Sequence, residues 1–140
     1  MRKITVAAVA ALATAVAWGY SQAAVETFHA TLNGPSEVPP VTTAATGAAS
    51  VNFDPATKQV TYNVTYSGLS GPAAAAHIHC GALPGANSGV AVAFPSPASP
   101  ITGTATLTDA QAADLEAGKC YINVHTAANK GGEIRGQLTK

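Results

Sequence analysis

The strongest constraint on the fold is a period of two in residues 59–66. Val60, Tyr62, Val64 and Tyr66 alternate there with threonine and asparagine. Successive side chains of a β-strand point to opposite faces, whereas an amphipathic helix repeats near every 3.6 residues. This stretch therefore predicts a strand with one apolar face and one polar face.

Shorter segments of the same kind recur along the chain, separated by residues typical of turns. They cover residues 27–32, 47–53, 74–79, 90–94, 101–107, 121–125 and 133–138. Residues 47–53 and 59–66 are joined by a turn-like segment, which predicts a hairpin. About eight short strands with regular turn signals predict an all-β fold, either a β-sandwich or a Greek-key barrel.

One short helix is also expected, over residues 109–117. Thr108 and Gln111 have the spacing of a capping box, and Gly118 supplies a typical helix end.

The N-terminus has the organisation of a secretory signal peptide. Arg2 and Lys3 precede an uncharged apolar run over residues 4–18, and small residues flank a cleavage site at Ala23. The run is shorter than the ~20 residues of a spanning helix. We therefore expect a signal peptide over residues 1–23 and one domain over 24–140, exported to the periplasm or the extracellular medium. A retained membrane anchor is the alternative.

The charge balance limits the partners. The whole chain has seven basic and seven acidic residues, and two of the basic ones lie in the signal segment. The mature chain is therefore slightly acidic, which argues against a nucleic acid or an anionic membrane. The sequence also lacks a G-x-S-x-G elbow, a glycine-rich phosphate loop and a CxxC pair. A metal ion or an extracytoplasmic protein is the expected partner.

Cys80 and Cys120 are the two cysteines of the chain. An even count in an exported protein predicts a disulfide, with thiolate metal ligands as the alternative. If the strands 74–79 and 121–125 are neighbours, the bond requires both cysteines on one face. Ile78 and Ile122 share that face, so it is expected to be the core.

Three of the four histidines lie in the same two segments. His77 and His79 project together from one strand, and His125 shares the face of Asn123 on the other. Adjacent strands would gather all four on the face opposite the cysteines. Imidazole is a common ligand of late first-row metals, so the sequence predicts a metal site, with copper favoured over zinc. The alternative is a polar cluster that only hydrogen-bonds. His29 is isolated and is expected to be an ordinary surface residue.

Glu133 and Arg135 lie two residues apart in the last predicted strand, and we expect both to face outward. A structural ion pair is one interpretation. The other is that these two residues, with Asn123, orient the metal ligands or form a surface for a partner.

Three motifs, in order, resemble the CHRD domain, named after the animal protein chordin. Residues 30–41 read ATLNGPSEVPPV, residues 76–81 read AHIHCG, and the last motif reads YINVHT over 121–126 with GEIRGQL over 132–138. The resemblance implies an extracytoplasmic, immunoglobulin-like β-barrel but implies little about activity. The family is not generally defined by cysteines, so Cys80 and Cys120 are a local addition.

A second resemblance is to copper–zinc superoxide dismutase, in which a His-x-His pair and a late strand histidine bind copper outside a Greek-key barrel. His77, His79 and His125 match this order, but the chain offers no candidate for the metal-bridging histidine. Three hypotheses follow. The first is a non-enzymatic exported domain that holds a copper-like ion, the second is a protein-interaction module without metal, and the third is a dismutase-like oxidoreductase.

Overall fold

The computed structural model describes residues 23–140. Apart from Ala23, the predicted signal peptide lies outside the described residues. None of the helices in the described part has the length and apolarity that a membrane crossing requires.

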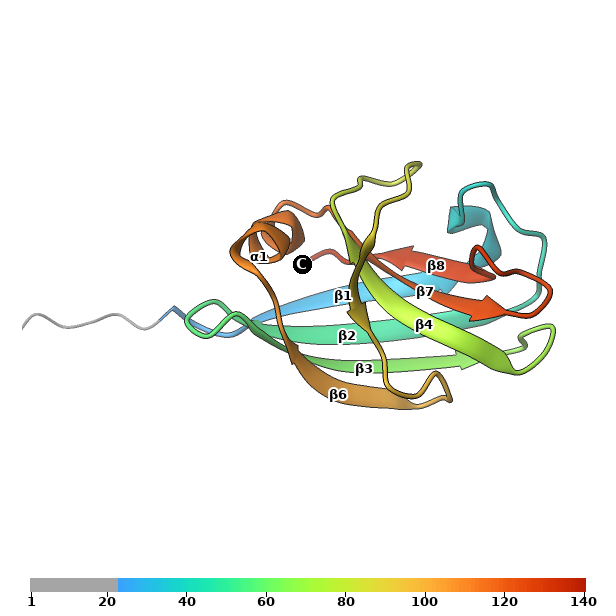
Figure 1. Cartoon of the computed structure of the whole chain (residues 1–140), viewed down its shortest axis with the longest axis horizontal. Coiled ribbons are helices and arrows are strands. Elements are labelled where there is room, and N and C mark those ends of the chain that lie inside the picture. Colours follow the sequence, from blue (N-terminus) through green and yellow to red (C-terminus); the bar gives the residue numbers. More distant parts are fainter. Residues whose placement is uncertain (1–22) are drawn as a thin grey trace, which may run out of the picture.

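Eight antiparallel strands form one curled sheet, in the order β5-β4-β7-β8-β1-β2-β3-β6 (Figure 1). The predicted all-β fold is confirmed, because this sheet makes a nearly closed barrel. At the open seam, Phe94 follows β5 and packs on Tyr62 of β3 with their ring centroids 4.4 Å apart. The strands are β1 (Glu26–Asn33), β2 (Thr46–Asp54), β3 (Gln59–Ser67), β4 (Ala73–Cys80), β5 (Val90–Ala93), β6 (Ile101–Thr106), β7 (Cys120–Thr126) and β8 (Ile134–Gln137).

Alternation along β3 sets the core side of the barrel. Val60, Tyr62 and Val64 are buried, while the residues between them are exposed. The predicted hairpin is confirmed, since β2 and β3 pair from Asp54↔Gln59 onward. Burying one face of each strand removes apolar area from water at about 25 cal/mol per Å².

The helix α1 (Asp109–Glu116) begins with the predicted capping box. The Thr108 hydroxyl accepts from the Gln111 backbone N–H at 3.2 Å, and the Gln111 side chain accepts from the Thr108 N–H at 2.9 Å. The helix ends one residue earlier than predicted, because Gly118, with a φ of 70°, turns the chain toward β7.

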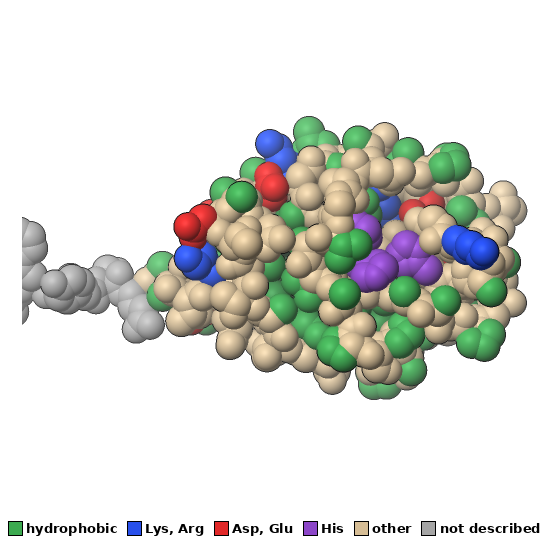
Figure 2. Space-filling model, in the orientation of Figure 1, with side chains coloured by type: hydrophobic (Ala, Val, Ile, Leu, Met, Phe, Trp, Pro, Cys, Tyr) green, Lys and Arg blue, Asp and Glu red, His purple; other side chains and the backbone are tan. Residues whose placement is uncertain are grey.

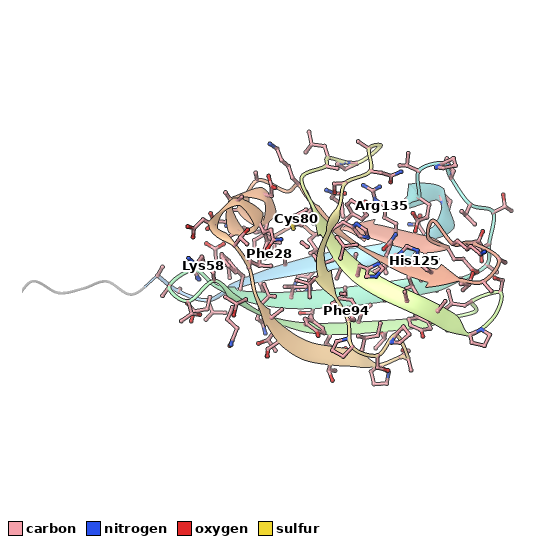
Figure 3. All side chains as sticks on the ribbon, viewed as in Figure 1. Phe28, Lys58, Cys80, Phe94, His125 and Arg135 are labelled. Atoms are coloured by element: carbon pink, nitrogen blue, oxygen red, sulfur yellow. A yellow bond between two sulfur atoms is a disulfide. The ribbon has the colours of Figure 1, made fainter. Side chains whose placement is uncertain are left out.

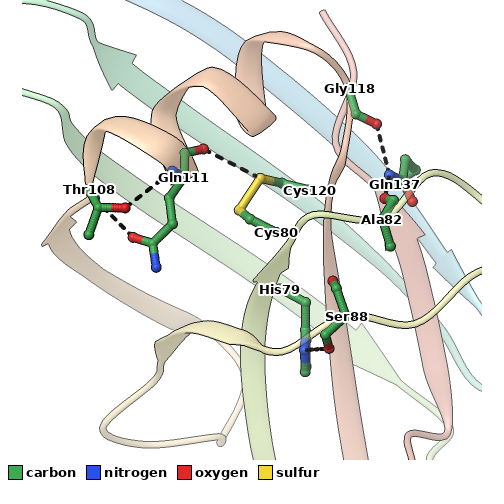
Figure 4. The surroundings of a disulfide bond; sticks show 9 residues. All are labelled: His79, Cys80, Ala82, Ser88, Thr108, Gln111, Gly118, Cys120 and Gln137. Atoms are coloured by element: carbon green, nitrogen blue, oxygen red, sulfur yellow. Dashed lines mark hydrogen bonds between the residues drawn. A yellow bond between two sulfur atoms is a disulfide. The ribbon is translucent and has the colours of Figure 1, made fainter.

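The disulfide that the sequence predicted is confirmed. Cys80 and Cys120 stand directly opposite each other on β4 and β7 and are bonded, 40 residues apart in sequence. The Sγ of Cys120 lies 3.8 Å from the Gln111 carbonyl of α1 (Figure 4). Ile78 and Ile122, paired on the same strands, are also buried, so the cysteines are on the core side as expected.

The opposite face of β7 and β8 is not open to solvent. Two loops cover it: residues 34–45, which begin with the short helix η1 (Gly34–Ser36), and residues 81–89. The Asn87 side chain donates to the Val38 carbonyl at 2.8 Å and so joins the two loops. Asn123, Glu133 and Arg135, which the sequence placed on an outward surface, are consequently only 3%, 0% and 1% exposed.

Candidate metal centre

The two strands that carry the histidines are neighbours. In the β4–β7 register His77 pairs with Asn123, His79 with Tyr121, and Ala75 with His125. Residues directly opposite each other share a face, so the three imidazoles project together, away from the core. Figure 2 shows histidine side chains gathered in one patch, with apolar and uncharged side chains around it and a few charged ones at its border. The predicted juxtaposition of the three histidines is therefore confirmed.

The nitrogen atoms of these imidazoles are close enough for one ion. One ring nitrogen from each of His77, His79 and His125 lies within 4.8 Å of the others. Nitrogens bound at ~2.1 Å from zinc or copper can be at most ~4.2 Å apart. Small rotations of the side chains would therefore bring all three within bonding distance. His79 is buried, and the other two histidines are half-buried.

Backbone carbonyls fix the proton positions on two of the rings. His79 Nδ1 lies 2.9 Å from the Ser88 carbonyl oxygen, and His125 Nδ1 lies 2.8 Å from that of Lys130. A carbonyl oxygen only accepts, so both Nδ1 atoms carry the proton. In the neutral rings Nε2 is then left with its lone pair, the form in which histidine binds metals.

His125 and His77 are linked through the free Nε2. His77 Nδ1 lies 3.0 Å from His125 Nε2, so it donates its proton to the lone pair there. The ring planes cross at 64° with centroids 4.9 Å apart. A metal ion bound by both imidazoles would lie in the region that this proton now occupies.

Asn123 meets the free Nε2 of His79 with an oxygen. Its Oδ1 lies 3.1 Å from His79 Nε2, while its Nδ2 donates to the Gly131 carbonyl at 3.4 Å. An oxygen opposite a nitrogen lone pair is unfavourable unless a cation lies between them. Rotating the amide by a half turn would only move the conflict, because Oδ1 would then face the Gly131 carbonyl. The pair therefore needs either a proton or a metal ion.

The surroundings disfavour the proton. Burial lowers the pKa of His79 below its usual value, although hydrogen bonds to Ser88 and Asn123 oppose the shift. Burial, followed by the nearby His125 and His79, also lowers the pKa of His77. Both rings are thus neutral at pH 7 and available as ligands.

Tyr121 is a neighbour of the site to which the sequence reasoning gave no role. Its ring stacks on His79 with centroids 4.8 Å apart and 4° between the planes. On its other side the Arg135 guanidinium carbon lies 3.5 Å from the ring centroid. The Tyr121 phenol ring therefore lies between the Arg135 guanidinium and the His79 imidazole. Figure 3 shows Arg135 and His125 in the same region of the barrel. The alternation along β7 places Tyr121 on the same face as His125, so the sequence pattern could have identified it as a neighbour of the site.

Glu133 lies apart from the histidines. Its carboxylate accepts from the Thr43, Ser70 and Thr126 hydroxyls at 2.6–2.8 Å and from the Ser70 backbone N–H at 2.9 Å. Burial raises its pKa, but these hydrogen bonds outweigh it and hold the pKa at about 2. Glu133 precedes β8, so the strand alternation does not reach it, and its carboxylate does not pair with Arg135.

His29 lies on β1, exposed, where its backbone pairs with Thr139. The structure thus places it as an ordinary surface residue, as expected.

Comparison with known proteins gives one match. The family model of the CHRD domain matches residues 28–138, which run from the third residue of β1 to just past the end of β8. Neither the curated proteins nor the solved structures provide a match. The three sequence motifs and the barrel agree with the family model, and the chain belongs to the CHRD domain family.

Proposed function

We propose that this protein is an exported binding domain that holds one copper-like ion through His77, His79 and His125. The confirmed part is coarser: the chain is a CHRD domain, a kind of extracellular module, with a disulfide that fits an oxidising compartment. Export rests on the signal-like N-terminus, and the metal rests on the geometry of the histidine cluster.

One observation supports the metal most directly. Two imidazoles have Nδ1–H fixed on carbonyl oxygens, and their Nε2 lone pairs face His77 and the Asn123 oxygen. When one nitrogen of a histidine binds a metal ion, the N–H of the other nitrogen usually donates to a neighbouring carbonyl or carboxylate. A cation would resolve the contact between His79 and Asn123, and it would take the place of the His77 Nδ1 proton, which would move to Nε2 of the same ring.

Copper is the better candidate because of the donor set. Three neutral nitrogens suit both copper and zinc, but divalent copper stands above zinc in affinity for such ligands. The cysteines are not available, since they are bonded to each other on the opposite face of the sheet. Zinc is therefore the second choice.

A site that holds an ion is favoured over one that catalyses a reaction. The buried carboxylate of Glu133 is engaged by hydroxyl groups away from the imidazoles. In residues 23–140, none of the hydrogen bonds of the three imidazoles involves a carboxylate that would act as an acid or base. Asn123 and Tyr121, which contact the His79 imidazole, are suited to orienting the metal-binding histidines.

The experiment is copper titration of the metal-free protein, followed by dialysis and elemental analysis. The wild type is expected to retain one equivalent of copper and to prefer it to zinc. His77→Ala/His79→Ala is expected to lose it, whereas the exposed control His29→Ala should bind as the wild type does. Equally weak uptake by all three proteins would refute the proposed site.

Export is tested separately, by N-terminal sequencing of the protein from its native compartment. Cleavage after Ala23 is the expected result, and elemental analysis of the same sample identifies any metal acquired there. Recovery of the intact chain from the cytoplasm would contradict the proposed localisation.

A further inference from the structure

A pocket of about 480 Å³ lies beside the covered face of β8, away from the histidines. Its walls come from the loop over residues 34–45, the loop over 81–89, and β8. Apolar side chains make up much of the lining, and its polar side chains are Ser36, Glu37, Arg135 and Gln137. Such a combination of apolar walls and a few convergent polar groups is typical of a small-molecule site. The apolar residues are Pro35, Val38, Pro40 and Pro84.

Arg135 brings a buried positive charge to this pocket. It is 1% exposed, and its Nη1 and Nη2 donate to Asn87 at 3.1 Å and to Gln137 at 3.4 Å. A guanidinium has five N–H donors, so it retains donors for another acceptor. The ion pairs within residues 23–140 join other side chains, at Lys58–Asp109 and Lys140–Glu26. Arg135 is therefore a fixed, buried cation without a carboxylate in contact.

Glu37 is the second buried group, and one of its oxygens has no partner. The side chain is 3% exposed, and Oε1 makes no hydrogen bond within the described residues. This oxygen lies against Gly132, where an added Cβ would collide with both Glu37 Oε1 and Asn123 Nδ2. A buried carboxyl without full hydrogen bonding is costly when ionised. Burial therefore favours the neutral form of Glu37, which can donate a hydrogen bond, and Glu37 is among the lining residues of the pocket.

We propose that this pocket binds a small organic carboxylate with an apolar remainder. Its carboxylate would pair with the Arg135 guanidinium and accept a hydrogen bond from the protonated Glu37. The prolines and Val38 would contact the apolar part. This site adjoins the proposed metal centre, because Arg135 packs on Tyr121 and Glu37 lies near Asn123, but the proposal does not require a bound metal.

The electrostatics select an anion over neutral or cationic ligands. A guanidinium binds a carboxylate through parallel N–H···O bonds, which makes this pair stronger than a bond to a neutral acceptor. Burial raises the pKa of Glu37 to about 7, against the opposing effect of Arg135. Glu37 also lines a second hollow together with Lys130, a further basic residue. Protonating Glu37 therefore leaves the guanidinium free for the ligand.

The test uses three probes of similar shape, benzoate, benzamide and benzylamine, added to the metal-free, ¹⁵N-labelled exported protein. Benzoate is expected to give saturable NMR shifts at the Arg135 side chain and in residues 35–38 and 84–85. Benzamide and benzylamine should not. Saturation by benzamide as strong as by benzoate, or benzoate shifts that bypass Arg135, would overturn the proposal.

The role of Glu37 has its own readout. Because binding requires protonated Glu37, benzoate affinity should fall by up to about tenfold per pH unit above the pKa of Glu37. Glu37→Gln should remove this dependence, while the control Glu26→Gln should retain it. The probe selectivity and pH profile of the wild type decide the matter even if Glu37→Gln folds poorly. A flat wild-type profile would contradict the assigned role.

Discussion

His77 Nδ1 lies 3.0 Å from His125 Nε2, although the two residues are 48 positions apart in the chain. The contact exists because β4 and β7 are paired and both histidines face away from the core. The same pairing brings the Asn123 oxygen to 3.1 Å from His79 Nε2. The Nε2 lone pairs of His125 and His79 therefore converge where only one proton is placed, and the Asn123 amide completes this arrangement.

Replacing Asn123 by leucine should weaken copper binding without removing a histidine. The change deletes the oxygen that faces His79 Nε2 and leaves an apolar group beside the ion, which for groups next to a metal site costs about 10–100-fold in affinity. Competition against a copper chelator measures the loss. The exposed Asn63→Leu is the control and should bind as the wild type does. Unchanged affinity in Asn123→Leu would show that the amide has no part in the site.

Strand parity is the part of this site that can be predicted from sequence, because it is a local property of the chain. It correctly placed His77 and His125 on one face and the cysteines on the other. The Ser88 and Lys130 carbonyls that fix the imidazole tautomers were not predictable. Every residue has a carbonyl, so only the path of the loop decides which one meets a histidine.

Loop placement also explains the residues that differ from expectation. Arg135 does lie on the outward face of β8, but residues 34–45 and 81–89 fold over that face and bury it. Glu133 lies before the first residue of β8, so a rule for strand interiors does not apply to it. Contacts made between loops depend on the whole fold, and no periodic pattern reports them.

Removing the disulfide should destabilise the domain without abolishing the metal site. The bond closes a loop of 40 residues, so Cys80→Ala/Cys120→Ala should lose about 3–4 kcal/mol in the chain-entropy model. Urea unfolding followed by tyrosine fluorescence measures this. Copper binding by the folded variant should persist, because the histidines face the other way. Loss of binding in a folded sample would instead implicate the sulfur atoms.

Glu133 should make the protein sensitive to acid. Its pKa in the folded state is about 2, below the 4.5 of a free glutamate, so the unfolded chain binds protons more readily between these values. The stabilisation is complete above pH ~4.5 and is lost as the pH falls through ~2, by about 3 kcal/mol in total. Glu133→Gln lacks this titration, so its unfolding free energy should approach that of the wild type toward pH 2. Parallel pH profiles would contradict the assignment.

Glu37 should have the opposite effect, although it too is a buried glutamate. Its folded-state pKa of about 7 exceeds the model-peptide value of 4.5, chiefly through burial, so the folded protein binds the proton more tightly. Stability from this group is therefore fully present below pH ~4.5 and is lost as the pH rises through ~7, by about 3 kcal/mol. Glu37→Gln resembles the protonated form at every pH. It should match the wild type near pH 4 and exceed it in unfolding free energy at pH 8, as measured by urea titration. A variant less stable than the wild type at both pH values would mean that ionised Glu37 has a stabilising partner, and the pocket beside Arg135 would then already be neutralised from within.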